Sequence, residues 1–211
     1  MQTEKLIDWL AEDLAVKPPK ARTHILIWLP VAALVTGIMF LGLVGIRTDL
    51  TSTGAMPTLV KTGLGLVIAV SAVRCARTLL RPEASIDQGL VAIFAVLLPL
   101  FLLVALDLAS WGQNGFFMRL LGKSILSCLT VIPLLAAIPL VTSLWILRAG
   151  APSHPAVTGA LAGLASGGLA IMAYGLYCTE DSTSFVAVWY SLAAIIVALG
   201  GSLAGHRWLR W

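Results

Sequence analysis

The chain has 211 residues, of which 59% are hydrophobic and only 11% are charged, and its formal net charge is +4. Soluble domains carry about 25% charged residues, and one core could not bury so much apolar surface. The composition therefore excludes a soluble globular protein and predicts an integral membrane protein. The positive charges are scattered between apolar segments, which suits lipid headgroups and membrane topology better than a nucleic-acid surface.

Residues 1–24 are the only substantial polar segment, and their pattern predicts a short amphipathic helix from Thr3 to about Leu14. The prolines between Lys17 and Lys20 end it, because proline removes a hydrogen-bond donor. Acidic residues, Asp13 among them, occupy much of the remaining surface. Such a helix suits docking into a basic groove of a partner. The alternative, a helix on the membrane surface, is disfavoured because the cytoplasmic leaflet is also negative. The apolar stripe consists of Leu6, Ile7, Leu10 and Leu14, with Trp9 beside it.

Six apolar segments follow, and each is long enough to cross a hydrocarbon core at about 1.5 Å per residue. The predicted fold is an all-α integral membrane protein, with a cytoplasmic segment (1–24) and a six-helix transmembrane domain (25–211). With the N-terminus inside, ten of the 14 Lys and Arg residues lie on the inner side, which favours two cytoplasmic termini and the bacterial inner membrane. The spans are placed near 25–46, 58–80, 88–110, 125–147, 157–177 and 185–205.

Glycines recur four residues apart in the last two apolar segments, a spacing that lets helix backbones approach closely in lipid. This pattern predicts a tightly packed helix pair. The glycines are Gly159, Gly163 and Gly167 in the fifth segment, and Gly201 and Gly205 in the sixth.

The polar stretch YCTEDSTSFVAVWYSL (177–192) separates these two segments and contains Cys178. The predicted topology puts Cys178 and Cys128 at the outer ends of two spans, and Cys75 near an inner end. A reactive pair on the outer face, where disulfides persist, is one interpretation. A structural bridge, or two unrelated small apolar residues, is the other.

The surroundings of the two outer cysteines differ. A helix N-terminus, with Arg119 and Lys123 upstream, should favour the thiolate of Cys128. At Cys178 the neighbouring carboxylates of Glu180 and Asp181 should disfavour it. A soft divalent ion could bind both sulfurs with a carboxylate nearby, or an oxidant could join them.

Other polar residues support weaker hypotheses. Arg47 and Asp49 are expected to form a turn at the end of the first span, and Asp107 is expected at the membrane interface rather than in a proton relay. The sequence contains no phosphate-binding glycine loop, no HExxH and no Ser-His-Asp pattern. We therefore expect neither an enzyme nor a cofactor. The alternatives are a membrane thiol oxidoreductase, which would use the same cysteines, and a small multi-span transporter.

Four stretches resemble the NrsF-like (negative regulator of sigma-F) family of six-span membrane anti-sigma factors. They are LIDWLAEDLAVKPP (6–19), GIRTDL (45–50), SHPAVTGALAGLASGG (153–168) and the Cys178 stretch, which is the most specific. The resemblance implies that the N-terminal segment holds an extracytoplasmic-function sigma factor at the membrane, without direct contact to nucleic acid. Leu6, Trp9, Leu10, Asp13 and Leu14 would then contact the sigma factor. It further implies that two outward-facing cysteines, here Cys128 and Cys178, respond to heavy-metal or oxidative stress.

Overall fold

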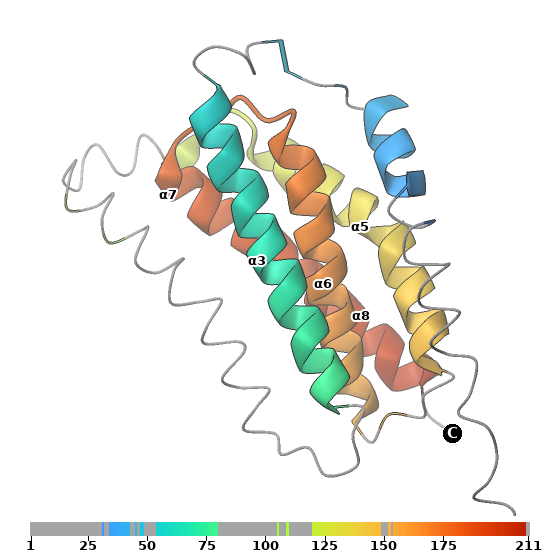
Figure 1. The fold of residues 1–211 in the computed structure, drawn as a ribbon. Coiled ribbons are helices and arrows are strands. Elements are labelled where there is room, and N and C mark those ends of the chain that lie inside the picture. Colours follow the sequence, from blue (N-terminus) through green and yellow to red (C-terminus); the bar gives the residue numbers. More distant parts are fainter. Residues whose placement is uncertain are drawn as a thin grey trace, which may run out of the picture.

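The computed structural model describes residues 31, 34–42, 45, 47–48, 54–79, 105, 109, 120–148, 152 and 154–209. Within these residues the chain is helical and contains no strand, which confirms the predicted all-α class (Figure 1). The helices are α3 (Ala55–Leu79), α5 (Ile125–Arg148), α6 (Pro155–Gly175), α7 (Thr183–Phe185), the π-helical turn η1 (Val186–Tyr190) and α8 (Ser191–Trp208). Residues 34–42 form a further helix.

In the described part of the chain, four helices are long and apolar enough to cross a membrane. They coincide with the spans predicted near 58–80, 125–147, 157–177 and 185–205. The first predicted span, 25–46, is described at 31, 34–42 and 45, and the third, 88–110, at 105 and 109 alone. The predicted N-terminal helix lies outside the described residues. Six spans and two cytoplasmic termini therefore remain predictions.

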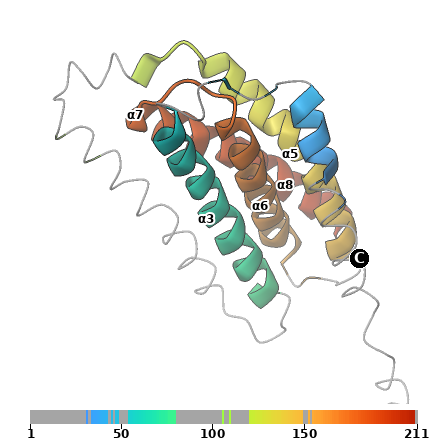
Figure 2. The ribbon, with the colours of Figure 1, turned by 45° about the horizontal axis from the view of Figure 1, so that its top comes forward.

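Helix α6 lies at the centre of the bundle, between α3 and α8, and α5 packs against both α6 and α8 (Figures 1 and 2). Glycines make this arrangement possible. A Cβ atom on Gly163 would lie 2.5 Å from the carbonyl oxygen of Val197 in α8, and one on Gly168 would lie 2.7 Å from the carbonyl oxygen of Gly65 in α3. No side chain fits at either position, so the backbones meet directly. The close helix pair expected from the glycine spacing is confirmed.

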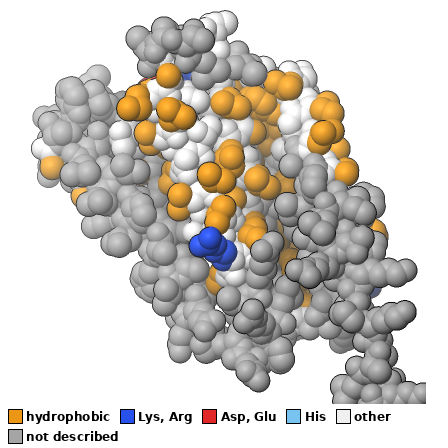
Figure 3. Space-filling view, viewed as in Figure 1, with side chains coloured by type: hydrophobic (Ala, Val, Ile, Leu, Met, Phe, Trp, Pro, Cys, Tyr) orange, Lys and Arg blue, Asp and Glu red, His pale blue; other side chains and the backbone are white. Residues whose placement is uncertain are grey.

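Hydrophobic side chains are spread over the outside of the described helices (Figure 3). Such a surface would be unusual on a soluble monomer, but it suits helices whose outer faces contact lipid. The most exposed large apolar side chains include Leu59, Leu126, Leu134, Trp145, Leu199 and Leu203.

Candidate functional site: a buried cysteine pair and a charged cluster

Cys128 and Cys178 meet inside the described part of the bundle. Cys128 lies in the first turn of α5, and Cys178 lies in the loop of residues 176–182, which we call the cysteine loop. Both are free thiols in one buried cluster, with exposed fractions of 0% and 2%. The two side chains interact closely enough for the Cys128 thiol to lower the pKa of Cys178. The structure thus brings together the two residues singled out by topology.

The end of α6 determines where Cys178 lies. The backbone N–H groups of Tyr177 and Cys178 both donate to the carbonyl oxygen of Tyr174, each over 3.0 Å. These bonds close the last turn tightly, so the chain folds back beneath its own helix end rather than extending away from it. Cys178 is therefore held against the first turn of α5.

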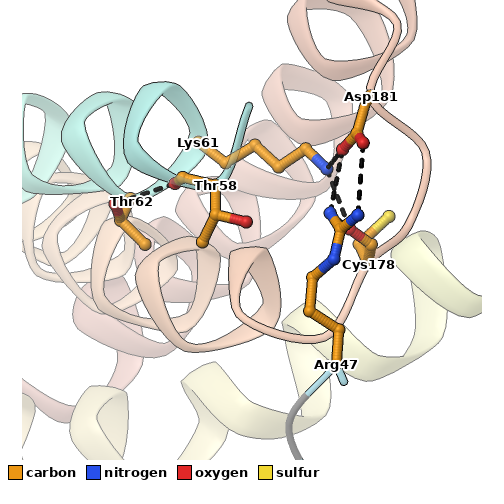
Figure 4. A network of polar contacts seen from close by, with 6 residues as sticks. All are labelled: Arg47, Thr58, Lys61, Thr62, Cys178 and Asp181. Carbon is orange, nitrogen blue, oxygen red and sulfur yellow. Dashed lines mark hydrogen bonds and ion pairs between the residues drawn. The ribbon is translucent and has the colours of Figure 1, made fainter. Parts of the chain in front are cut away.

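A charged cluster surrounds the backbone of Cys178 (Figure 4). Lys61 of α3 donates to the carbonyl oxygen of Cys178 over 2.8 Å and to Asp181 Oδ1 over 2.7 Å. Arg47 donates to the same carbonyl over 3.2 Å and to both carboxylate oxygens of Asp181, over 3.0 and 3.3 Å. The side chains of Lys61 and Arg47 are 1% and 4% exposed, so both cations are buried in this cluster.

The side chain of Arg47 pairs with Asp181, 134 positions away in the chain. Asp49 lies outside the described residues, so the turn expected at Arg47 and Asp49 stays a prediction. The sequence pattern did not indicate the long-range contact with the cysteine loop. One signal could have indicated this cluster: two cations and one carboxylate occur near the predicted outer ends of three spans.

The charges and hydrogen bonds around the cysteine loop lower the pKa values of both Asp181 and Cys178. Burial raises the pKa of Asp181, but the hydrogen bonds and charges of Arg47 and Lys61 outweigh it, and the pKa is lowered. Asp181 is thus a paired carboxylate and not a free charge that opposes a thiolate. The hydrogen bond from Cys128 lowers the pKa of Cys178 to about 6 against the effect of burial, with smaller contributions that include the charge of Lys61. Cys178, expected to be the poorer thiolate, is therefore a good one.

A layer of loop and aromatic residues covers the pair. The carboxylate of Glu180 accepts a 2.8 Å hydrogen bond from the backbone N–H of Lys123, and Trp189 Nε1 donates to the carbonyl oxygen of Leu120 over 2.7 Å. Gly122 has a φ of 22°, and a Cβ atom there would lie 2.5 Å from the ring of Phe185. Glycine is needed at this position, since any side chain would displace the buried Phe185. The layer ties the start of α5 to the cysteine loop.

Two buried tyrosines, which sequence reasoning assigned no chemical role, lie beside the sulfurs. Tyr174 interacts with Cys128 and Tyr190 with Cys178, although neither hydroxyl has a hydrogen bond of standard geometry. Their rings meet edge to face with centroids 5.8 Å apart. Tyr190 belongs to η1, and such π-helical turns are frequent at functional sites.

The remaining predicted residues lie elsewhere. Cys75 is buried in α3 with Leu161, in a cluster separate from the cysteine pair. Asp107 lies outside the described residues. So do the five positions predicted to contact a sigma factor, which are Leu6, Trp9, Leu10, Asp13 and Leu14.

The described residues contain no group of three or more His, Cys, Asp and Glu side chains that could hold a metal ion.

Comparison with known proteins identifies related sequences. The family model "Negative regulator of sigma F" (NrsF) matches residues 10–211. The "Anti-sigma-F factor NrsF" of Caulobacter vibrioides is 42% identical over 90 residues, which cover 43% of this chain and 42% of that protein. The "Probable anti-sigma-F factor NrsF" of Azospira oryzae is 30% identical over 217 residues, and this match covers all of both chains. No solved structure matches.

Proposed function

The chain belongs to the NrsF family of negative regulators of sigma F, and we propose that it sequesters an extracytoplasmic-function sigma factor at the inner membrane. In this proposal, heavy-metal or oxidative stress acts on Cys128 and Cys178 from the periplasmic side and releases the sigma factor. The observation that carries the proposal is the burial of these two free thiols in one cluster, although they come from different elements of the bundle. Two sulfurs in contact can respond together to one reagent.

Oxidation of the pair to a disulfide requires one two-electron oxidant, for example hydrogen peroxide. The thiolate of Cys178 attacks the peroxide, one oxygen is transferred to sulfur, and the other leaves as water after it takes up a proton. The Cys128 sulfur then attacks the sulfenic acid, an S–S bond forms, and a second water leaves. Overall, two S–H bonds are replaced by one S–S bond, and the peroxide is reduced to two waters. A low pKa at Cys178 supports the first step, because the thiolate is the nucleophile.

A soft metal ion is the second signal that this site could receive. Thiolate ligands suit soft ions, and the pair offers two sulfurs. The described residues do not supply a group of three ligands. A bound ion would therefore be held by Cys128 and Cys178, with its other positions open to water or to small anions. Open positions suit a transient signal better than a structural metal.

Cysteine substitutions test the sensor. We expect Cys128→Ser and Cys178→Ser to abolish the induction of a sigma-dependent reporter by cadmium or peroxide in cells that carry the full-length protein. Cys75→Ser is the matched control, because Cys75 is also buried but packs in a different cluster, and it should respond like the wild type. Unchanged induction in both outer-cysteine variants would remove the pair from the mechanism. A response to peroxide alone would assign the site to oxidants.

The N-terminal segment is the proposed docking site for the sigma factor. Its acidic and apolar faces fit a groove with basic and apolar residues. The full-length protein in detergent, with Leu10→Asp or Leu14→Asp, should no longer capture the sigma factor. Lys5→Gln, which removes neither an acidic nor an apolar side chain, should capture it. Equal capture by all three variants would place the docking surface elsewhere in the chain.

A further inference from the structure

We propose that Arg47 is the positioning residue that couples the cysteine loop to the first apolar segment, so that a change at Cys178 reaches the N-terminal segment. This inference rests on the proposed function, in which the sulfurs receive the signal and the N-terminal segment holds the partner. It adds a physical connection between them, which begins at the contacts of Arg47 with Cys178 and Asp181 (Figure 4).

Arg47 is attached to the cysteine loop at three successive points. Its backbone N–H donates to the carbonyl oxygen of Leu176 over 3.1 Å. Its guanidinium donates to the carbonyl oxygen of Cys178 and, as a two-pronged fork, to both carboxylate oxygens of Asp181. Paired bonds of this kind fix orientation as well as distance. The guanidinium is almost fully buried, so water competes poorly for these bonds.

Arg47 is also close in sequence to the helix of residues 34–42. The chain leaves this helix through a hydrogen bond from the Gly45 backbone N–H to the carbonyl oxygen of Phe40, 3.2 Å long, and Gly45 has a φ of 79°. Glycine adopts this left-handed conformation without strain. Arg47 lies five positions after the last described residue of the helix, and in this inference a displacement of Arg47 acts on that end.

One face of the helix of residues 34–42 is exposed, and the other packs on the bundle. Leu34, Ile38 and Leu41 are 64%, 63% and 57% exposed, whereas Phe40 is buried in the cluster that also contains both cysteines. Figures 1 and 2 show the helix at the side of the bundle, near α5. A cavity of about 230 Å³ lies between Thr36 and Gly37 on one side and residues of α3 and α6 on the other. The helix therefore has room to shift when its attachment at Arg47 changes.

Chemistry at Cys178 must disturb this attachment. A disulfide requires the two Cβ atoms to lie about 3.8 Å apart with a dihedral angle near 90°, and a bridging metal imposes its own sulfur geometry. In this inference either change moves the backbone of Cys178 and with it the carbonyl oxygen that accepts from Arg47. In the resting protein the Arg47 contacts hold the first segment in its sequestering position. Their rupture releases it.

The test measures input and output separately in the full-length protein in cells. Output is the activity of a sigma-dependent reporter. Input is the thiol state of the cysteine pair after treatment with diamide, a two-electron thiol oxidant, read by gel shift after alkylation. In Arg47→Met we expect basal reporter activity to rise by about fivefold or more, the lower end of typical coupling. The cysteine pair should still oxidise as in the wild type.

Two further variants test whether the effect depends on the paired hydrogen bonds from Arg47 to the Asp181 carboxylate. Arg47→Lys keeps the charge but not the two-pronged bond, and it should raise basal activity by less than Arg47→Met. Lys123→Met is the matched control, because it also removes a cation near the loop. The side chain of Lys123 is exposed and lies outside the charged cluster, so basal activity should not change. Protection of Cys75 from alkylation reports whether each variant is folded.

Three outcomes would overturn the inference. One is normal repression and induction in Arg47→Met. Another is equal derepression in Lys61→Met, which would assign the effect to the stability of the loop as a whole. The third is loss of Cys75 protection in Arg47→Met together with wild-type behaviour in Arg47→Lys. Failure of the proposed function would appear differently, as unchanged induction in Cys128→Ser and Cys178→Ser.

Discussion

Lys61 donates a 2.7 Å hydrogen bond to Asp181 from a side chain that is 1% exposed. Taking a charged ammonium out of water costs several kcal/mol unless a partner compensates it. Here two cations, Lys61 and Arg47, share one carboxylate and one backbone carbonyl, that of Cys178. The cysteine loop is therefore held in place by charge as well as by packing, and Asp181 pairs with both cations.

The first prediction concerns the stability of this cluster. Asp181→Asn removes the carboxylate charge that Lys61 and Arg47 share. Breaking a buried pair costs about 3–5 kcal/mol, and because Asp181 is 34% exposed we expect a loss near or below the lower end of that range. Unfolding in detergent can be followed with a thiol-reactive fluorophore, since all three cysteines are buried. Glu180→Gln, which still offers an acceptor to Lys123, should unfold close to the wild type. Equal stability of both variants would contradict the prediction.

The second prediction is a pH dependence with a defined sign. The folded-state pKa of Asp181 is lowered from 3.8. A carboxyl group whose pKa is lower in the folded protein than in the unfolded chain stabilises the fold at any pH above the unfolded-state pKa. This stabilisation is lost as the pH falls through the folded-state pKa. The wild type should therefore exceed Asp181→Asn in stability at neutral pH, and the difference should shrink as the pH falls below 3.8. Unfolding measured at several pH values checks this. A difference that grows towards acid would show that the sign is wrong.

The third prediction concerns the thiolate of Cys178. In a Cys75→Ala background, the ultraviolet absorbance of the thiolate should rise with a midpoint near pH 6. Cys128→Ala removes the hydrogen-bond donor and should move the midpoint up towards the ordinary value of 9.0. Cys128→Ser keeps a donor and should leave the midpoint low. If Cys128→Ala and Cys128→Ser titrate together, the hydrogen bond is not the cause of the shift.

The sequence predicted the helices of this protein better than its site. Apolar length and glycine spacing were sufficient for α3, α5, α6 and α8, because both properties are local. The meeting of Cys128 and Cys178 followed from topology, since both were placed at outer helix ends. The charged cluster was missed because Lys61 and Asp181 are 120 positions apart, and their pairing depends on the path of the loop after α6.

Two other errors have related causes. The pKa of Cys178 was expected to be high because the neighbouring carboxylates were considered without the hydrogen bond from Cys128, which is the main cause that lowers it. Tyr174 and Tyr190 were not linked to the sulfurs, because the face that a helical residue presents depends on rotation about the helix axis. At Tyr190 the π-helical turn η1 changes that rotation. A hydropathy pattern shows neither which polar side chains contact one another nor how far a helix is rotated about its axis.

The last prediction tests the interface between α6 and α8. A Cβ atom on Gly163 would lie 2.5 Å from the carbonyl oxygen of Val197, an atom that cannot move without displacing the α8 backbone. Gly163→Ala should therefore destabilise the bundle by about 1–3 kcal/mol, as overpacking does. Gly200→Ala is the matched control, because a Cβ atom there meets nothing within 4 Å. It should be neutral or stabilising by up to about 1 kcal/mol, since alanine favours helix more than glycine does. Both variants can be compared by thermal unfolding in detergent. If Gly163→Ala were as stable as Gly200→Ala, the two helices could not be as close as the structure has them.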